Sequence, residues 1–126
     1  MSLSRLGAFV FAASAALSAQ VPALDPAGLT QVLKSGTWTV VEFGGPTCIP
    51  CKKMQPILAE LQQHYGNRAQ IRNFYVTEHI KEARAFQIMA MPTQVIFDAS
   101  GREVARHVGF WEKGEFQAAL AKAGLK

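Results

Sequence analysis

One segment limits the possible folds more than any other. Residues 38–43 form a run of strand-forming residues that is apolar on both faces, apart from Thr39 and Glu42. A strand of this kind belongs in the middle of a sheet that is covered on both sides. A turn over residues 44–47 follows it, and apolar side chains at helical spacing then predict a helix over residues 48–65. The chain is therefore expected to pass from a buried strand through a tight turn into a helix.

The remaining pattern predicts the other layers of the domain. We expect further helices that begin at residues 26, 81 and 113, and further strands over residues 70–76, 94–97 and 103–108. The last two strands are joined by Asp98-Ala99-Ser100-Gly101, a sequence typical of a hairpin turn. Crossover helices and a closing hairpin predict an α/β fold, with a mixed sheet of about four to five strands and helices on both faces.

The N-terminal segment differs from the rest of the chain. Residues 1–19 combine a short, weakly positive start, an apolar run over residues 6–17 and small residues near their end, as a secretory signal peptide does. An uncleaved membrane anchor is the alternative, but Gln20 and Pro22 interrupt the apolar stretch, and a span needs about 20 mainly apolar residues. We favour cleavage. The sequence thus predicts a folded domain over residues 20–126 that is periplasmic or secreted, or membrane-anchored if the segment is retained.

Composition argues against two classes of function. The formal net charge is +4, but the basic residues are scattered and their only adjacent pair is Lys52-Lys53, so no nucleic-acid-binding surface is predicted. A structural zinc site takes four protein ligands, and His64, His79 and His107 have no paired spacing with the cysteines or with each other. We therefore expect no metal, and we expect His64 and His107 to be solvated or structural.

Cys48-Ile49-Pro50-Cys51 stands where the turn enters the long helix, and it carries the clearest chemical signal. A structural disulfide gains most by closing a long loop, and this pair would close almost none. At a helix N-terminus the free N–H groups and the helix dipole stabilise a thiolate, and Lys52 and Lys53 add positive charge. The pattern predicts thiol–disulfide exchange, with Cys48 attacking and Cys51 resolving the mixed disulfide.

Several motifs together resemble the thioredoxin family. They are, in order, Val40-Val41-Glu42-Phe43, Cys48-Ile49-Pro50-Cys51-Lys52, Pro56, Met91-Pro92-Thr93 and Val108-Gly109. The likeness covers nearly all of the chain from about Trp38 onward. It implies a thioredoxin fold and exchange with protein thiols and disulfides through a redox-active Cys48–Cys51 disulfide, without a further cofactor.

The resemblance also implies roles for individual residues. Pro92 is expected to be cis and to face the cysteines, so that the backbone of Met91 can pair with a substrate peptide. Glu42 is expected to be a buried acid beneath Cys51 that accepts its proton; an exposed or ion-paired Glu42 is the alternative. The partner lysine of the family is replaced, with Asn73 at or near its position. The expected substrate-binding residues are Ile49, Pro50, Met91, Pro92 and Gly109.

Departures from the family pattern favour a specialised exported relative over a general cytoplasmic thioredoxin. Residues 44–47 contain no aromatic side chain, Ile49-Pro50 replaces the usual Gly-Pro, and the opening strand is weak, with only residues 21–24 available. We expect a monomeric reductase that is itself reduced by a membrane electron-transfer protein. The alternatives are an oxidant that introduces disulfides, a non-catalytic adaptor with a vestigial CxxC, and a zinc-bridged dimer.

Overall fold

The structure is a computed structural model that describes residues 7–8 and 20–126. The predicted signal peptide therefore lies almost entirely outside the described residues and stays a prediction. The elements, in chain order, are α1 (Pro26–Leu33), β1 (Trp38–Gly44), α2 (Ile49–Tyr65), the short 3-10 helix η1 (Gly66–Arg68), β2 (Ala69–Tyr75), α3 (Ile80–Ala85), β3 (Thr93–Phe97), β4 (Glu103–Val108) and α4 (Lys113–Ala123). No helix in this part of the chain is both long enough and apolar enough to span a membrane.

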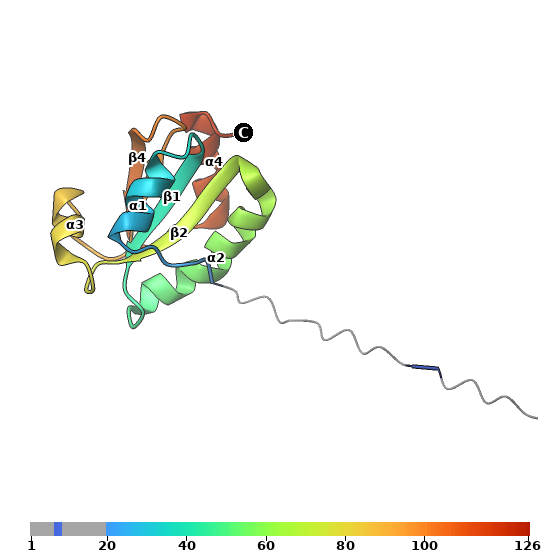
Figure 1. The fold of residues 1–126 in the computed structure, drawn as a ribbon, viewed down its shortest axis with the longest axis horizontal. Helices are drawn as coiled ribbons and strands as arrows, with labels where there is room; N and C mark the ends of the chain where they lie inside the picture. Colours follow the sequence, from blue (N-terminus) through green and yellow to red (C-terminus); the bar gives the residue numbers. More distant parts are fainter. Residues whose placement is uncertain (1–6, 9–19) are drawn as a thin grey trace, which may run out of the picture.

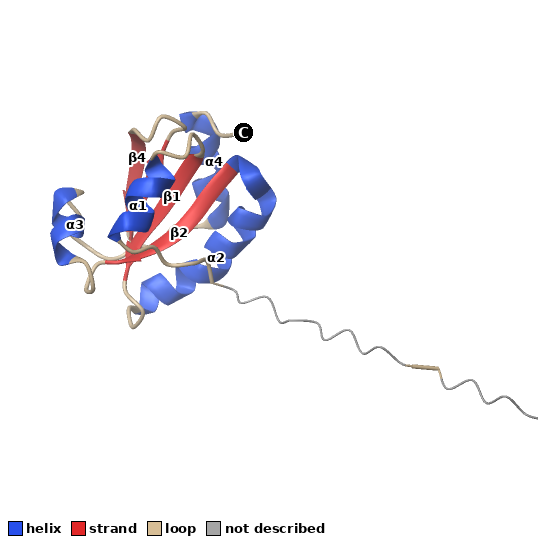
Figure 2. Ribbon diagram, in the orientation of Figure 1, coloured by secondary structure: helices blue, strands red, loops and turns tan. Residues whose placement is uncertain are grey.

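The strands form one mixed sheet in the order β2-β1-β3-β4. Figure 2 shows the strands in red, with β1, β2 and β4 labelled. β1 runs parallel to β2 and antiparallel to β3, and β3 and β4 form the predicted hairpin. The sheet has four strands within the described residues. The weak opening segment adds an isolated bridge between Ala23 and Asn73, with backbone hydrogen bonds of 2.8 Å on both sides of it.

Helices cover both faces of the sheet, as predicted (Figure 1). On one face, α2 and α4 bury a core against Val40 of β1, Ile71 of β2 and Ile96 of β3. On the other face, α1 packs Leu29 and Val32 against the side chains that alternate with these along the strands. Alternation along β1 therefore divides the interior into two cores. Glu42, two residues after Val40, lies on the α2 face.

The topology brings the end of β1, the turn before α2, the start of β3 and the end of β4 to one edge of the sheet. Gly44 ends β1 just before α2, while Thr93 begins β3. Thr93 pairs with Phe43 on one side and with Val108, the last residue of β4, on the other. The turn before α2, the start of β3 and the end of β4 therefore meet at the carboxyl end of the central strand.

Candidate functional site

The two cysteines lie at this edge and form a disulfide, with their Cα atoms 5.1 Å apart. Cys48 is the N-cap of α2 and is partly exposed, whereas Cys51 lies in the first turn and is buried. The N–H of Cys51 donates to Cys48 Sγ at 3.4 Å. The predicted difference in exposure between the two cysteines is confirmed.

The glycine at the end of β1 permits the Cys51 sulfur to lie close to the backbone of that strand. A side chain at Gly44 would place its Cβ 3.0 Å from Cys51 Sγ, closer than real Cβ atoms normally come, so a glycine here lets the sulfur lie against the end of β1. A Cβ at Gly45 would lie 3.5 Å from Met91 Sδ. The turn thus lies between the disulfide and the loop that carries Met91.

The loop before β3 contains a cis peptide bond between Met91 and Pro92, as predicted. Gly109, which has a φ of +94°, donates its N–H to the carbonyl of Pro92 at 2.8 Å. The structure therefore brings Met91, Pro92 and Gly109 together. Apolar side chains remain accessible at or beside the expected substrate-binding positions, with exposed fractions of 63% for Ile49, 39% for Met91 and 41% for Phe110.

Glu42 is buried on the same face of the sheet as α2, with an exposed fraction of 1%. The Cβ position of Gly44 lies 3.0 Å from Cys51 Sγ and 3.9 Å from Glu42 Cγ, so the Glu42 side chain and the Cys51 sulfur flank the same glycine. None of the ion pairs among the described residues includes Glu42. Burial raises the pKa of Glu42 to about 8, while the hydrogen bond from Gln94 acts in the opposite direction. The exposed alternative for this residue is therefore wrong, and within the part of the chain that the structure describes the ion-paired alternative is wrong as well.

Glu42 belongs to a row of polar residues that crosses the whole sheet, one residue from each strand. Asn73 of β2 and Gln94 of β3 pair with Glu42 on either side, and His107 of β4 pairs with Gln94. Gln94 Nε2 lies 3.2 and 3.3 Å from the two Glu42 oxygens, and Gln94 Oε1 lies 3.0 Å from His107 Nδ1. Sequence reasoning did not identify Gln94 or His107 as site residues. The available signal was a glutamine within a strand that is otherwise mostly apolar.

Asn73 stands directly opposite Glu42, where the resemblance implied a replaced lysine, but its side chain bonds elsewhere. Its amide exchanges two hydrogen bonds with the amide of Gln55, at 2.8 and 3.0 Å, and donates to the carbonyl of Val21 at 2.9 Å. Gln55 also donates to the carbonyl of Cys51 at 3.3 Å. Asn73 therefore ties α2 and the N-terminal segment to the sheet, and it supplies no charge to Glu42.

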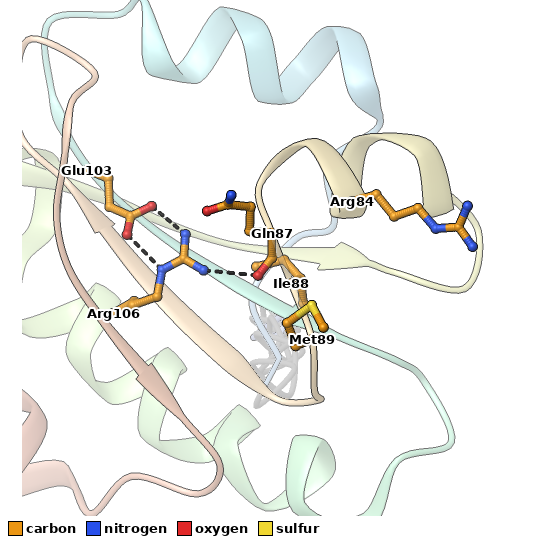
Figure 3. A pocket seen from close by; sticks show the side chains of 6 residues that line it. All are labelled: Arg84, Gln87, Ile88, Met89, Glu103 and Arg106. Atoms are coloured by element: carbon orange, nitrogen blue, oxygen red, sulfur yellow. Dashed lines mark hydrogen bonds and ion pairs between the residues drawn. The ribbon is translucent and has the colours of Figure 1, made fainter.

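No three His, Cys, Asp or Glu side chains of the described chain converge as metal ligands. A surface pocket of the described chain lies apart from the cysteine site. The pocket in Figure 3 is lined by Arg84, Gln87, Ile88, Met89, Glu103 and Arg106. The guanidinium of Arg106 bonds there to Glu103 and to the carbonyl oxygens of Phe86 and Gln87. The lining includes neither cysteine nor Glu42.

Comparison with known proteins agrees with this geometry. The family model for thioredoxin matches residues 23–122. A thioredoxin from Acidithiobacillus ferridurans is 34% identical over 72% of this chain and 83% of its own length. A thioredoxin from Alicyclobacillus acidocaldarius subsp. acidocaldarius is 29% identical over 78% of this chain and 92% of its own length. A crystal structure of chloroplastic thioredoxin z, which is 21% identical, shares the fold with a TM-score of 0.74 over 85% of this chain and 96% of that one.

The range matched by the family model, residues 23–122, includes the strand β1, the cysteine turn and the proline loop. The structure places the Cys48–Cys51 disulfide at the start of α2 within the same fold. Members of this family act on protein thiols and disulfides. This chain belongs to the thioredoxin family and is a protein-disulfide oxidoreductase.

Proposed function

We propose that this protein reduces disulfides in other proteins outside the cytoplasm, with Cys48 as the attacking thiol and Cys51 as the resolving thiol. The observation that carries these two roles is the asymmetry of the pair, because Cys48 is partly exposed at the N-cap of α2 and Cys51 is buried behind it. An exposed first sulfur can reach a substrate disulfide, and a shielded second sulfur can reach only the first.

The start of α2 supports Cys48 as the nucleophile. The free N–H groups of a helix N-terminus and its dipole favour negative charge, and in the reduced protein they would stabilise a Cys48 thiolate. The N–H of Cys51 already points at Cys48 Sγ, at 3.4 Å. Lys52 and Lys53 are exposed next to the pair and add positive charge.

The reaction then proceeds in two exchanges. The Cys48 thiolate attacks one sulfur of the substrate disulfide, that bond breaks, and the other substrate sulfur leaves as a thiolate that takes up a proton. The Cys51 thiol next gives its proton to Glu42, and its sulfur attacks Cys48, which releases the second substrate thiolate. The substrate gains two electrons and the protein is left with the Cys48–Cys51 disulfide. A dithiol protein, in our proposal a membrane electron-transfer protein, returns it to the dithiol and is itself oxidised, so no further cofactor takes part.

Substrate binding is proposed for the surface around Cys48. Ile49 and Met91 expose apolar side chains there. The other proposed substrate-binding residues are Pro50, Pro92 and Gly109. The turn before Cys48 contains Gly44, Gly45, Pro46 and Thr47, so it places no aromatic ring beside the sulfur. A surface of this kind suits an extended, partly apolar peptide segment that carries a disulfide.

The proposed location outside the cytoplasm rests on the sequence of residues 1–19. We expect mass spectrometry of the protein recovered from its native host to find a mature chain that begins between about residues 19 and 24, as a cleaved signal peptide requires. An intact N-terminus on a membrane-bound protein would support an anchor instead. An intact N-terminus on a cytoplasmic protein would contradict the proposed location.

Single cysteine substitutions test the division of labour between the two sulfurs. Reduced protein is mixed with a disulfide-bonded peptide, and products are separated by mass. We expect Cys51→Ser to accumulate a covalent complex through Cys48, because the resolving thiol is missing, and Cys48→Ser to lose turnover. Turnover by Cys48→Ser at the parent rate would show that the cysteine pair is structural and would favour the adaptor. A covalent complex through Cys51 in the parent would reverse the assignment.

Glu42→Gln tests the proton acceptor. The substitution keeps the shape and removes the base, so we expect the resolving step to slow by roughly 10²-fold and mixed disulfide to accumulate. The pKa of Glu42 is raised by burial from 4.5 to about 8, so the parent loses stability as the pH rises through this window. The stability advantage of Glu42→Gln should grow there by about 1.4 kcal/mol per pH unit.

Rapid-mixing kinetics and denaturant unfolding between pH 4 and pH 9 measure both effects. Glu60→Gln is the matched control, because Glu60 is an exposed carboxylate on α2 whose only ion-pair partner among the described residues is Lys113. This control should keep the parent's resolving rate and pH-dependence of stability. If Glu42→Gln behaves in the same way, Glu42 is only a structural residue.

A further inference from the structure

Within the described residues, the Glu42 carboxyl group has a single hydrogen-bonding side chain, that of Gln94. The same Nε2 atom lies within 3.3 Å of both carboxyl oxygens and 3.1 Å from the carbonyl of Gly109. Gln94 is itself fully buried. The direction in which this amide presents its N–H groups therefore decides how the carboxyl group is held.

The orientation of the Gln94 amide is set from its other end. Gln94 Oε1 can only accept, so the 3.0 Å contact with His107 Nδ1 requires an N–H on that ring nitrogen. A reversed amide would place its carbonyl oxygen against the Glu42 carboxylate and against the carbonyl of Gly109. His107 and Gly109 thus hold Gln94 with its donors toward Glu42.

The ring of His107 is held in turn by stacking. It lies parallel to Trp111, with ring centroids 4.3 Å apart and an interplanar angle of 10°, and Trp111 stacks on Phe116 at 4.2 Å. The backbone N–H of Trp111 also donates to Met54 Sδ on α2. A continuous set of contacts therefore runs from the α2–α4 core through His107 and Gln94 to the carboxyl group beside Cys51.

We propose that Gln94 and His107 are positioning residues for the resolving step, acting as a pair that keeps the Glu42 carboxyl group oriented and favours its ionised form. The inference rests on the proposed role of Glu42. The groups that face Glu42 from the neighbouring elements are Cys51 from α2, the neutral Asn73 from β2, the neutral Gln94 from β3 and, through Gln94, His107 from β4. No cation pairs with Glu42 among the described residues. The hydrogen bond from Gln94 is therefore the side-chain interaction in this part of the chain that stabilises the charged form of Glu42.

Gln94→Leu and His107→Phe test this pair. The first nearly keeps the side-chain volume and removes the donor; the second keeps an aromatic ring against Trp111 and removes Nδ1. The rate of substrate release from a preformed Cys48 mixed disulfide is measured from pH 5 to pH 10. We expect the midpoint of this profile to rise by about one pH unit in Gln94→Leu. Release at pH 7 should then be about tenfold slower, because a smaller fraction of the Glu42 carboxyl group is ionised at that pH. His107→Phe should shift the midpoint in the same direction by a smaller amount.

Matched controls separate this role from general packing. Gln62→Leu removes a half-buried glutamine of α2, which bonds to the backbone of Ala69 and Ile71. His64→Phe removes an exposed histidine of the same helix, and both controls should keep the parental midpoint. If Gln94→Leu does not fold, His107→Phe carries the test alone. Parental midpoints in both test variants, with the profile lost in Glu42→Gln, would overturn the positioning role and leave the proposed function standing. A parental profile in Glu42→Gln would overturn both.

Discussion

A carboxyl group inside a protein core is unfavourable when charged, because burial removes the water that stabilises its charge. Glu42 is in this position, with 1% of its surface exposed, no ion pair among the described residues and one donating side chain, Gln94. The pKa of Glu42 therefore rises to about 8. At neutral pH such a group is near the balance point between its two forms, and it can accept a proton from a neighbour that must also ionise inside the protein.

The fold supplies that neighbour through the connection from β1 to α2. Glu42 is two residues from the end of the central strand, and the chain then turns at Gly44 so closely that Cys51 Sγ lies against it. The same connection makes Cys48 the N-cap of α2 and leaves it accessible. One strand–turn–helix unit thus separates the two sulfurs into an outer one beside free N–H groups and an inner one beside a carboxyl group.

Local sequence patterns predicted the parts of this unit, whereas the support for Glu42 depends on strand register. The apolar run of 38–43, the helix that begins near Cys48 and the proline loop could all be recognised from neighbouring residues. The strand ends differ from the predicted ones by about one residue, because hydrogen bonding extends β1 to Gly44 and starts β3 at Thr93. The Glu42–Gln94–His107 contacts join three strands, and Glu42 and Gln94 are 52 positions apart. Only the three-dimensional pairing shows that these residues share one row.

In the proposed mechanism Glu42 is a buried acid that exchanges its proton near neutral pH. The most direct measurement is the NMR titration of its side-chain carboxyl carbon in protein labelled with ¹³C-glutamate, with the resonance assigned by its loss in Glu42→Gln. We predict a midpoint near pH 8, well above the ordinary value of 4.5, because burial disfavours the charged form. A midpoint at the ordinary value would contradict the proposed role of Glu42, since the group would then be fully ionised at neutral pH and its burial would have no chemical consequence.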